Sequence, residues 1–340
     1  MGNPQYLRNR RILFLVIAFV VGVIVTGIYS RVNYINSIEK TPLKVCLNSE
    51  TKEIFETQFE DKKDFNRYYE YEISSTSKGA DFVFTSNIND INTENEYSVE
   101  AYSPLIICLK DEKDAKNYLK TNTKNGFLTC NDGAKKIKDS AYDKITCDFA
   151  RVIDVILKNG DWSDLGGEDK KITIYCPQPD TVEGELFYKF LLITLNNGKY
   201  PENNLEEIDA KAKKFLDSPN IIQTDIASRI EKLGEEMPEG DIYILFEADF
   251  LNHAQEYAKI LVTYPELTVI KQVYLQFNNK ELKDKITDIF NASSFSYTLN
   301  TEFSISMYRN TEFPDLRDSG GSRRTNFNVQ DGFNYYELNN

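Results

Sequence analysis

The feature that most constrains this chain is an uncharged, apolar run from Ile12 to Ser30, about 19 residues long. At about 1.5 Å of rise per residue, a helix of this length crosses the roughly 30 Å hydrocarbon layer of a bilayer. Arg8, Arg10 and Arg11 precede the run and a single arginine follows it. This positive bias predicts a cytoplasmic amino terminus. We therefore expect a single-pass protein of the cell membrane, with everything after the helix outside the cell.

A cleaved signal peptide is the main alternative for this run. Its apolar core would be shorter, and small residues would precede the cleavage site. Here Ile28, Tyr29 and Ser30 stand in that place. We therefore interpret the run as an uncleaved signal anchor.

The charge of the chain limits the class of partner. The net charge is −13, and removing the +3 of residues 1–11 leaves −16 for the part beyond the membrane. Such an acidic exterior disfavours nucleic acid and anionic lipid as partners. The exterior is also long enough for a large core or for two lobes.

The cysteines and histidines of the chain give little support for a metal site or a catalytic nucleophile. The chain has five cysteines without a C-x-x-C pair, and its one histidine is His253. A zinc site needs several Cys or His ligands at close spacing, and a catalytic triad needs a histidine held beside its nucleophile. We predict no cofactor, no metal and no enzymatic activity. If the exterior is oxidising, Cys130 with Cys147 is the first disulfide to test.

Apolar runs alternate with amphipathic segments along the exterior. The expected strands are 43–47, 69–73, 80–84, 97–109, 171–176, 241–250 and 267–277. The expected helices are 149–157, 181–195, 205–215, 222–233, a segment around His253, and 280–290. This alternation is typical of an α/β domain with mainly parallel sheets. A loop is expected around Trp162.

Polar residues recur where the expected strands end. The positions are 48–49, 85–87, 102–103, 180–183 and 247–249. Ligands of α/β sheets bind at the carboxyl ends of strands. Several of these positions also begin helices, where backbone N–H groups are available to a ligand. The recurrence predicts a binding site that includes Asn48 and Asn87.

Several segments together resemble a known family. The run KVCLNSETKEIFETQFE (44–60) resembles the opening of the type II extracellular, or periplasmic, solute-binding proteins of bacteria. Residues 79–87 are similar to a G-A-x-x-D-hydrophobic-S stretch of its molybdate-binding branch. Residues 102–109 and 177–184 resemble the crossing segment and the entry to the second lobe. Residues 246–247 and 262–265 resemble the closing part of variants associated with von Willebrand A domains.

The resemblance implies a two-lobed α/β fold of the type II periplasmic-binding-protein kind. It places ligand contacts from the first lobe at Ser49, Ser86 and Ser103, a hydroxyl of the second lobe at Thr181, and an acid at Glu247. With Asn48 and Asn87 from the strand ends, these residues form the predicted ligand site.

The chain departs from the family pattern at two places. Only residues 74–78 lie between the second strand and the G-A-x-x-D-like segment, so the family's helix there is missing. At the start of the second-lobe helix, Val182-Glu183-Gly184 replaces small residues. A carboxylate at Glu183 would repel an oxyanion unless a cation neutralised it.

The predicted organisation follows from the anchor and the resemblance. Its parts are a cytoplasmic segment (1–11), the transmembrane helix (12–30), a linker (31–41), lobe I (42–112 and 250–312), lobe II (113–249) and a disordered tail (313–340). We predict binding of a small ligand between the lobes, for transport or sensing. The alternative is a degenerate binding-protein fold that acts as a structural or protein-interaction ectodomain of a cell-surface assembly.

Overall fold

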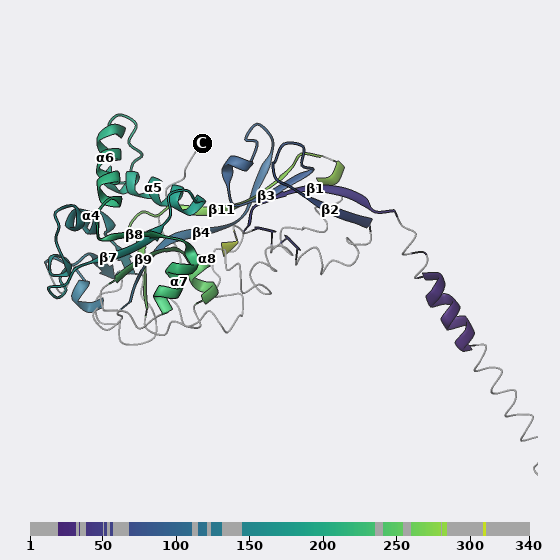
Figure 1. Cartoon of the computed structure of the whole chain (residues 1–340), viewed down its shortest axis with the longest axis horizontal. Coiled ribbons are helices and arrows are strands. Elements are labelled where there is room, and N and C mark those ends of the chain that lie inside the picture. The colour runs from purple at the N-terminus through teal and green to yellow at the C-terminus, as the bar shows by residue number, and fades with distance from the viewer. Residues whose placement is uncertain are drawn as a thin grey trace, which may run out of the picture.

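The computed structural model describes most of the chain after the amino-terminal segment (Figure 1). The described residues are 20–31, 34, 39–49, 51–52, 55–56, 68–110, 115–120, 124–130, 145–234, 241–253, 260–279, 281–283 and 309–310. Outside them lie residues 12–19 of the predicted anchor, residues 284–290 of the last expected helix, and the predicted tail.

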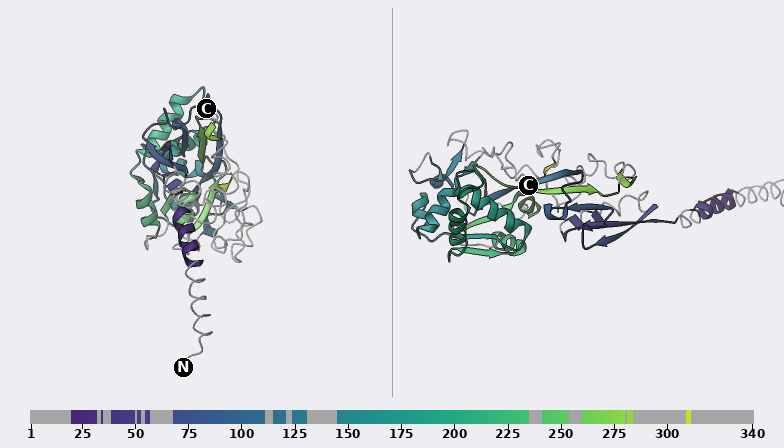
Figure 2. Two further views of the ribbon diagram at one scale, coloured as in Figure 1. Left: turned by 90° about the vertical axis from the view of Figure 1, so that its right-hand side faces the viewer. Right: turned by 90° about the horizontal axis from the view of Figure 1, so that it is seen from above.

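The described part of the apolar run, residues 20–30, is helical together with Arg31, and its side chains are exposed. This helix extends away from the body of the molecule (Figures 1 and 2). Among the residues that the structure describes, no helix is both long enough and apolar enough to span a membrane. The transmembrane anchor and the localisation therefore stay predictions.

Five strands form what we call the first sheet region. Their order is β2 (Tyr69–Ser74), β1 (Thr41–Leu47), β3 (Phe82–Thr85), β11 (Ile270–Phe277) and the first part of β4 (Tyr97–Leu109). β1 is parallel to β2 and β3, whereas β11 is antiparallel to β3 and β4. A short strand, β12 (Arg309–Asn310), also pairs with β4.

The connection from β2 to β3 contains no helix. Within β1, Cys46 is level with Ser74 at the end of β2, and Val45 is level with Phe82 at the start of β3. The end of β2 and the start of β3 therefore lie at the same level on opposite sides of β1. The connection only has to cross β1, a distance of about 9.6 Å for two strand spacings. Residues 75–81 span this as a turn. The predicted absence of a helix here is confirmed.

β4 joins the first sheet region to a second one. Its residues up to Pro104 pair with β11, and its residues Leu105–Leu109 pair with β9 and β10. Proline has no backbone N–H, which suits a position where a strand changes partners. The strands of the second sheet region are, in order, β8 (Ile221–Thr224), β7 (Thr173–Pro177), β9 (Asp241–Phe246), the second part of β4, β10 (Leu261–Pro265), β6 (Ile145–Cys147) and β5 (Leu128–Cys130).

Helices cover both faces of the second sheet region. The α-helices are α4 (Phe149–Leu157), α5 (Val182–Leu195), α6 (Leu205–Leu216), α7 (Ile226–Gly234) and α8 (Glu247–His253). The 3-10 helices are η1 (Ile88–Asp90), η2 (Ala115–Tyr118) and η3 (Trp162–Leu165). α4, α5 and α6 lie on one face, and α7 and α8 lie on the other (Figure 1).

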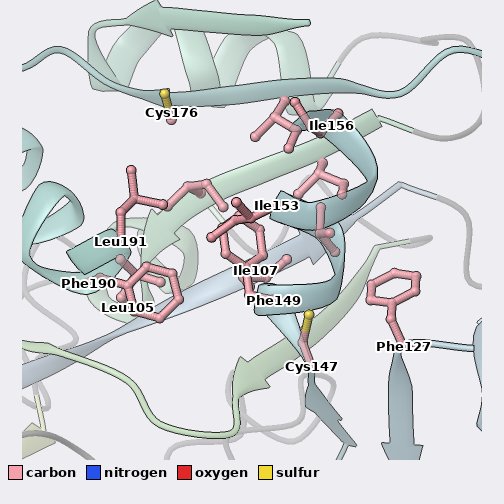
Figure 3. Close-up of a cluster of buried hydrophobic side chains, with 14 of the residues drawn as sticks. Leu105, Ile107, Phe127, Cys147, Phe149, Ile153, Ile156, Cys176, Phe190 and Leu191 are labelled. Atoms are coloured by element: carbon pink, nitrogen blue, oxygen red, sulfur yellow. The ribbon is translucent and has the colours of Figure 1, made fainter. Parts of the chain in front are cut away.

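The largest core lies between α4, α5 and the second part of β4. Phe149, Ile153 and Ile156 follow helical spacing along α4, and they point toward Leu105 and Ile107 of β4 (Figure 3). The intervening residues of β4 point to the opposite face and pack with residues of α7, α8 and β9. Both faces of this strand are buried, which explains its continuous apolar run.

Several expected elements differ from the structure. The sheet is mixed and not mainly parallel, because β4 and β11 are antiparallel to each of the strands they pair with in the described residues. The expected helix 222–233 begins as strand β8, and the expected strand 241–250 ends at Phe246, where α8 takes over. β10 was not predicted, and the expected loop at Trp162 is the capped 3-10 helix η3.

The strand pairing also bears on the domain and disulfide predictions. β10 falls within the range predicted for lobe I, yet it pairs with β6 and the second part of β4. The lobe boundaries themselves stay a prediction. Cys147 is buried and free, and it stands opposite Leu128, whereas Cys130 stands opposite Ile145. The expected Cys130–Cys147 bridge is therefore wrong.

Candidate functional site

The first group of predicted site residues lies at the carboxyl ends of β1 and β3. Asn48 Nδ2 donates a hydrogen bond of 2.6 Å to Ser86 Oγ. The Oδ1 atom of Asn48 accepts from the backbone N–H of Thr51 at 2.9 Å. Asn48 therefore caps the following helical turn, and Ser49 is an exposed residue of that turn. The two strand ends are joined by these side chains, and Ser86 is buried.

The second group is Asn87 and Thr181, which line one cavity of about 580 Å³. Asn87 follows β3 in the first sheet region, and its Oδ1 accepts from Asn89 N at 3.0 Å. Thr181 caps α5 in the second sheet region, where its Oγ1 accepts from Gly184 N at 3.0 Å. The lining residues are Asn87, Pro177, Pro179, Asp180, Thr181, Val182, Gly184, Glu185, Phe187, Tyr188, Lys213, Leu216, Asp217 and Gln223. Residues of both regions thus contribute to one open space.

Acidic side chains dominate the charge of this cavity. Asp180, Glu185 and Asp217 line it together with one lysine, Lys213. Tyr188 donates its hydroxyl proton to Asp209, and burial with the neighbouring carboxylate raises the pKa of Tyr188 to about 12. The phenol therefore stays neutral at physiological pH. The lining suits a neutral or cationic group better than an anion.

The third group, Ser103 and Glu247, is buried and serves the fold. Ser103 Oγ accepts from the backbone N–H of Ala248 at 2.9 Å, at the start of α8. Glu247 is 1% exposed, and Tyr264 donates its hydroxyl proton to the Glu247 carboxylate. Neither residue lines the cavity. Of the seven predicted residues, Asn87 and Thr181 line this cavity and the other five do not.

The most strongly charged group at the junction surrounds Glu183, in the first turn of α5. Its carboxylate is 2.7 Å from Arg229 Nη2 on α7 and 3.2 Å from Lys271 Nζ on β11. Lys271 Nζ is also 3.5 Å from Asp249 Oδ2 and lies 5.2 Å from the centre of the Phe246 ring. Burial raises the pKa of Glu183, but the charges of Lys271 and Arg229 lower it by more, so the net shift is downward. The carboxylate is thus ionised and neutralised internally.

Sequence reasoning identified Glu183 but missed Arg229 and Lys271. A signal for Lys271 exists, because it shares the inward-facing positions of β11 with Val273 and Leu275. A lysine at such a position needs an anionic partner. Arg229 gives a similar signal, because it lies three residues after Ile226 and four before Leu233, on the apolar side of α7, where it is buried.

A single glycine allows the start of α5 to pack closely. An added Cβ at Gly184 would lie 1.8 Å from the carbonyl oxygen of Gln178 and 2.8 Å from the Cα of Pro179. Any larger residue would push α5 away from the end of β7. The glycine therefore fixes where both Thr181 and Glu183 lie.

Metal binding is not favoured within the described residues, where no three His, Cys, Asp or Glu side chains are grouped so as to hold an ion. The buried cysteines also lack thiolate character. Burial raises the pKa of Cys176 to about 12 and raises those of Cys108 and Cys147 well above the ordinary value. These thiols act as small core side chains.

The chain matches no protein-family model and no curated protein. Among solved structures it is similar to PstS from Borrelia burgdorferi, with 15% identity and a TM-score of 0.44 over 76% of this chain and 95% of that one. An ABC transporter from Clostridium perfringens is 10% identical, with a TM-score of 0.49 over 87% and 93%.

A phosphate ABC transporter substrate-binding protein with bound phosphate, also from Clostridium perfringens, is 10% identical, with a TM-score of 0.42 over 80% and 100%. Likenesses at these identities and scores assign no role to any residue of this chain.

Proposed function

We propose that the chain is a membrane-anchored extracellular binding protein that holds a small organic ligand between its two sheet regions. The observation that supports this is the cavity of about 580 Å³ lined by Asn87 from one region and by Thr181 from the other. Cavities of roughly 300–1,000 Å³ are typical of small-molecule sites. The amide of Asn87 offers N–H donors, and Phe187 and Tyr188 supply aromatic surface.

The charge of the lining supports a neutral or cationic ligand. Asp180, Glu185 and Asp217 outnumber Lys213, so an oxyanion would meet repulsion in this cavity. This differs from what the resemblance to the molybdate-binding branch implies. An ammonium or guanidinium group on the ligand would gain from the same carboxylates.

The anchor supports a role beside the membrane. The spacer between Ser30 and the first strand at Thr41 is short, so a helix in the bilayer would hold the sheet regions close to the surface. In this arrangement the protein delivers its ligand to a transporter, or senses it for a membrane partner.

A ligand screen by thermal unfolding tests this function. Trp162 is the only tryptophan of the chain, is 2% exposed, and packs 4.9 Å from the ring centre of Tyr118. Its fluorescence therefore follows unfolding of the second sheet region in the full chain, kept in detergent micelles. The panel contains amines, amino acids, peptides, sugars and oxyanions. A ligand present at 100 times its Kd should add about 2.7 kcal/mol to the free energy of unfolding.

The matched variants are Asp217→Asn in the cavity and Asp154→Asn on α4. Asp154 is exposed, pairs with Lys158 and does not line the cavity. A cationic ligand should lose affinity with the first variant and keep it with the second. If no compound of the panel shifts the unfolding of the full chain, the proposed function is wrong.

The second candidate is a protein-interaction ectodomain, and the Glu183 cluster is the observation that favours it. At the junction, the carboxylate of Glu183 already pairs with the two buried cations, Arg229 and Lys271, which are therefore not available to an anionic ligand. This function predicts that no small molecule shifts unfolding. It also predicts that a membrane partner cross-linked to the chain in cells is still captured when Gln223→Trp narrows the cavity.

A further inference from the structure

Four charged side chains are brought together where the two sheet regions meet. Arg229 and Lys271 are the cations, and Glu183 and Asp249 are the carboxylates. The Arg229 and Lys271 side chains are 1% and 2% exposed, so both cations have left water. Removing an ion from water costs several kcal/mol unless close partners compensate it. The energy of this cluster therefore depends on its carboxylates.

The two cations come from different parts of the fold and converge on one carboxylate. Arg229 is held on α7, where its Nη1 also donates to the carbonyl oxygen of Thr224 at 2.8 Å. Lys271 is held on β11, opposite Ser103 of β4. Each cation bonds a different oxygen of Glu183, Oε2 and Oε1 respectively. Two cations on separate elements that bind the two oxygens of one carboxylate make the donor set of an anion site.

The carboxylate reaches this donor set from the solvent side. The Glu183 side chain is 17% exposed, whereas the cations beneath it are almost fully buried. The Nε atom of Arg229 is buried and has no hydrogen-bond partner among the described residues, so this guanidinium has donor capacity beyond its present bonds. The Glu183 carboxylate thus lies on the solvent side of two buried cations, as an anion bound in a cationic pocket would.

We propose that Glu183 is a built-in anionic ligand: its carboxylate fills an anion site formed by Arg229 and Lys271 and ties the two sheet regions together. α5 belongs to the second sheet region and β11 to the first, so the Glu183–Lys271 bond joins them directly. The chain does at this place, by itself, what a soluble oxyanion would otherwise do. This inference does not depend on the cavity binding a ligand.

Chemical rescue tests the proposal. The variant Glu183→Ala removes the carboxylate and leaves a space above two buried cations. We expect the full-length variant to unfold at a lower temperature than the wild type, as followed by Trp162 fluorescence. Formate, acetate and phosphate should each restore most of the loss in a saturable way. Chloride at the same ionic strength should not, because it cannot bridge the two cations with two oxygens.

The matched control is Glu185→Ala in the same turn of α5. Glu185 is exposed and pairs only with Lys189 among the ion pairs that the structure shows for it. The wild type and this variant should show no specific response to formate. The variant Glu183→Gln keeps the shape of the side chain and leaves no space, so it should be destabilised and not rescued.

Two results would overturn the proposal in the folded variant. One is wild-type stability of Glu183→Ala, and the other is a response to formate that is absent or equal to that of the wild type. If Glu183→Ala fails to fold, its refolding yield is compared in formate and in chloride. A higher yield in formate supports the built-in ligand, and equal yields overturn it. Failure of the ligand screen would leave these outcomes unchanged.

Discussion

The first turn of α5 has two sides with opposite properties. On one side Glu183 meets Arg229 and Lys271, which are buried and bonded to its two oxygens. On the other side Thr181 and Glu185 line an open cavity shared with Asn87. One turn of helix thus contributes to a closed, neutralised charge centre and to an open, acidic surface.

The difference between these sides lies in what surrounds each carboxylate. Glu183 faces α7 and β11, whose cations are withdrawn from water, and its interactions are therefore strong. Glu185 faces solvent and pairs with Lys189 one turn further along, an arrangement that contributes little. Neighbouring positions of one helix can therefore serve stability and binding separately.

The largest expected effect is on the closed side, at Lys271. Lys271→Met should lower the free energy of unfolding by about 3–5 kcal/mol, because it removes one of the two cations at Glu183 and the cation beside Asp249. Denaturant unfolding followed by Trp162 fluorescence measures the loss. The control is Lys213→Met on the cavity side, where the lysine side chain is 65% exposed and its loss should hardly change stability. If the two variants lost the same unfolding free energy, the closed side would be no more important for stability than the open side.

The next effect concerns the residue that positions both sides, Gly184. Gly184→Ala places a Cβ 1.8 Å from the carbonyl oxygen of Gln178, so the backbone must move. We expect a loss of about 1–3 kcal/mol in the free energy of unfolding. The same displacement should weaken the Glu183–Lys271 bond and reshape the cavity together. Wild-type stability of this variant would show that α5 is not held tightly against the end of β7.

Acid should weaken the closed side of this turn. Folding lowers the pKa of Glu183, mainly through Lys271 and Arg229 acting against the effect of burial. Its contribution is therefore complete above the ordinary pKa of 4.5 and is lost as pH falls from there through the folded value. One such group changes stability by at most about 1.4 kcal/mol per pH unit.

The measurement is the difference in unfolding free energy between the wild type and Glu183→Gln across this range of pH. The difference should be constant near neutral pH and should shrink below pH 4.5. Glu185→Gln should follow the wild type throughout. A difference that stays constant down to strong acid would mean that Glu183 is not ionised by the cluster.

Much of the fold could be predicted because local patterns agreed with burial. The prediction for β4, Tyr97–Leu109, and that for α4, Phe149–Leu157, match the structure at both ends. In α4 the apolar residues follow one face, and Asp148 caps the start. The change from β9 to α8 was not predicted, because the apolar run continues across it. The acids Glu247 and Asp249, which are typical of a helix start, were the available signal.

The site could be predicted less well, because side-chain partners depend on contacts between distant segments. Glu247 follows the end of β9 as expected, whereas Ser103 lies in the middle of β4, and each is bonded to a backbone or side-chain partner within the fold. The predicted repulsion at Glu183 is reversed by Arg229 and Lys271, which lie 46 and 88 residues further along the chain. No local pattern connects these positions, so their meeting emerges only from the packing of α5, α7 and β11.

The smallest effect belongs to the open side, at Thr181. Thr181→Ala removes the Oγ1 atom that accepts from Gly184 N, and the loss of such a cap typically costs about 1 kcal/mol. Thr181→Ser keeps the oxygen and should stay close to the wild type. Because the Glu183 cluster is on the other side of the turn, the acid-dependent loss of stability should persist in Thr181→Ala. A variant that lost both the cap energy and the acid dependence would show that the two sides are coupled, and that α5 moves as a whole when either is disturbed.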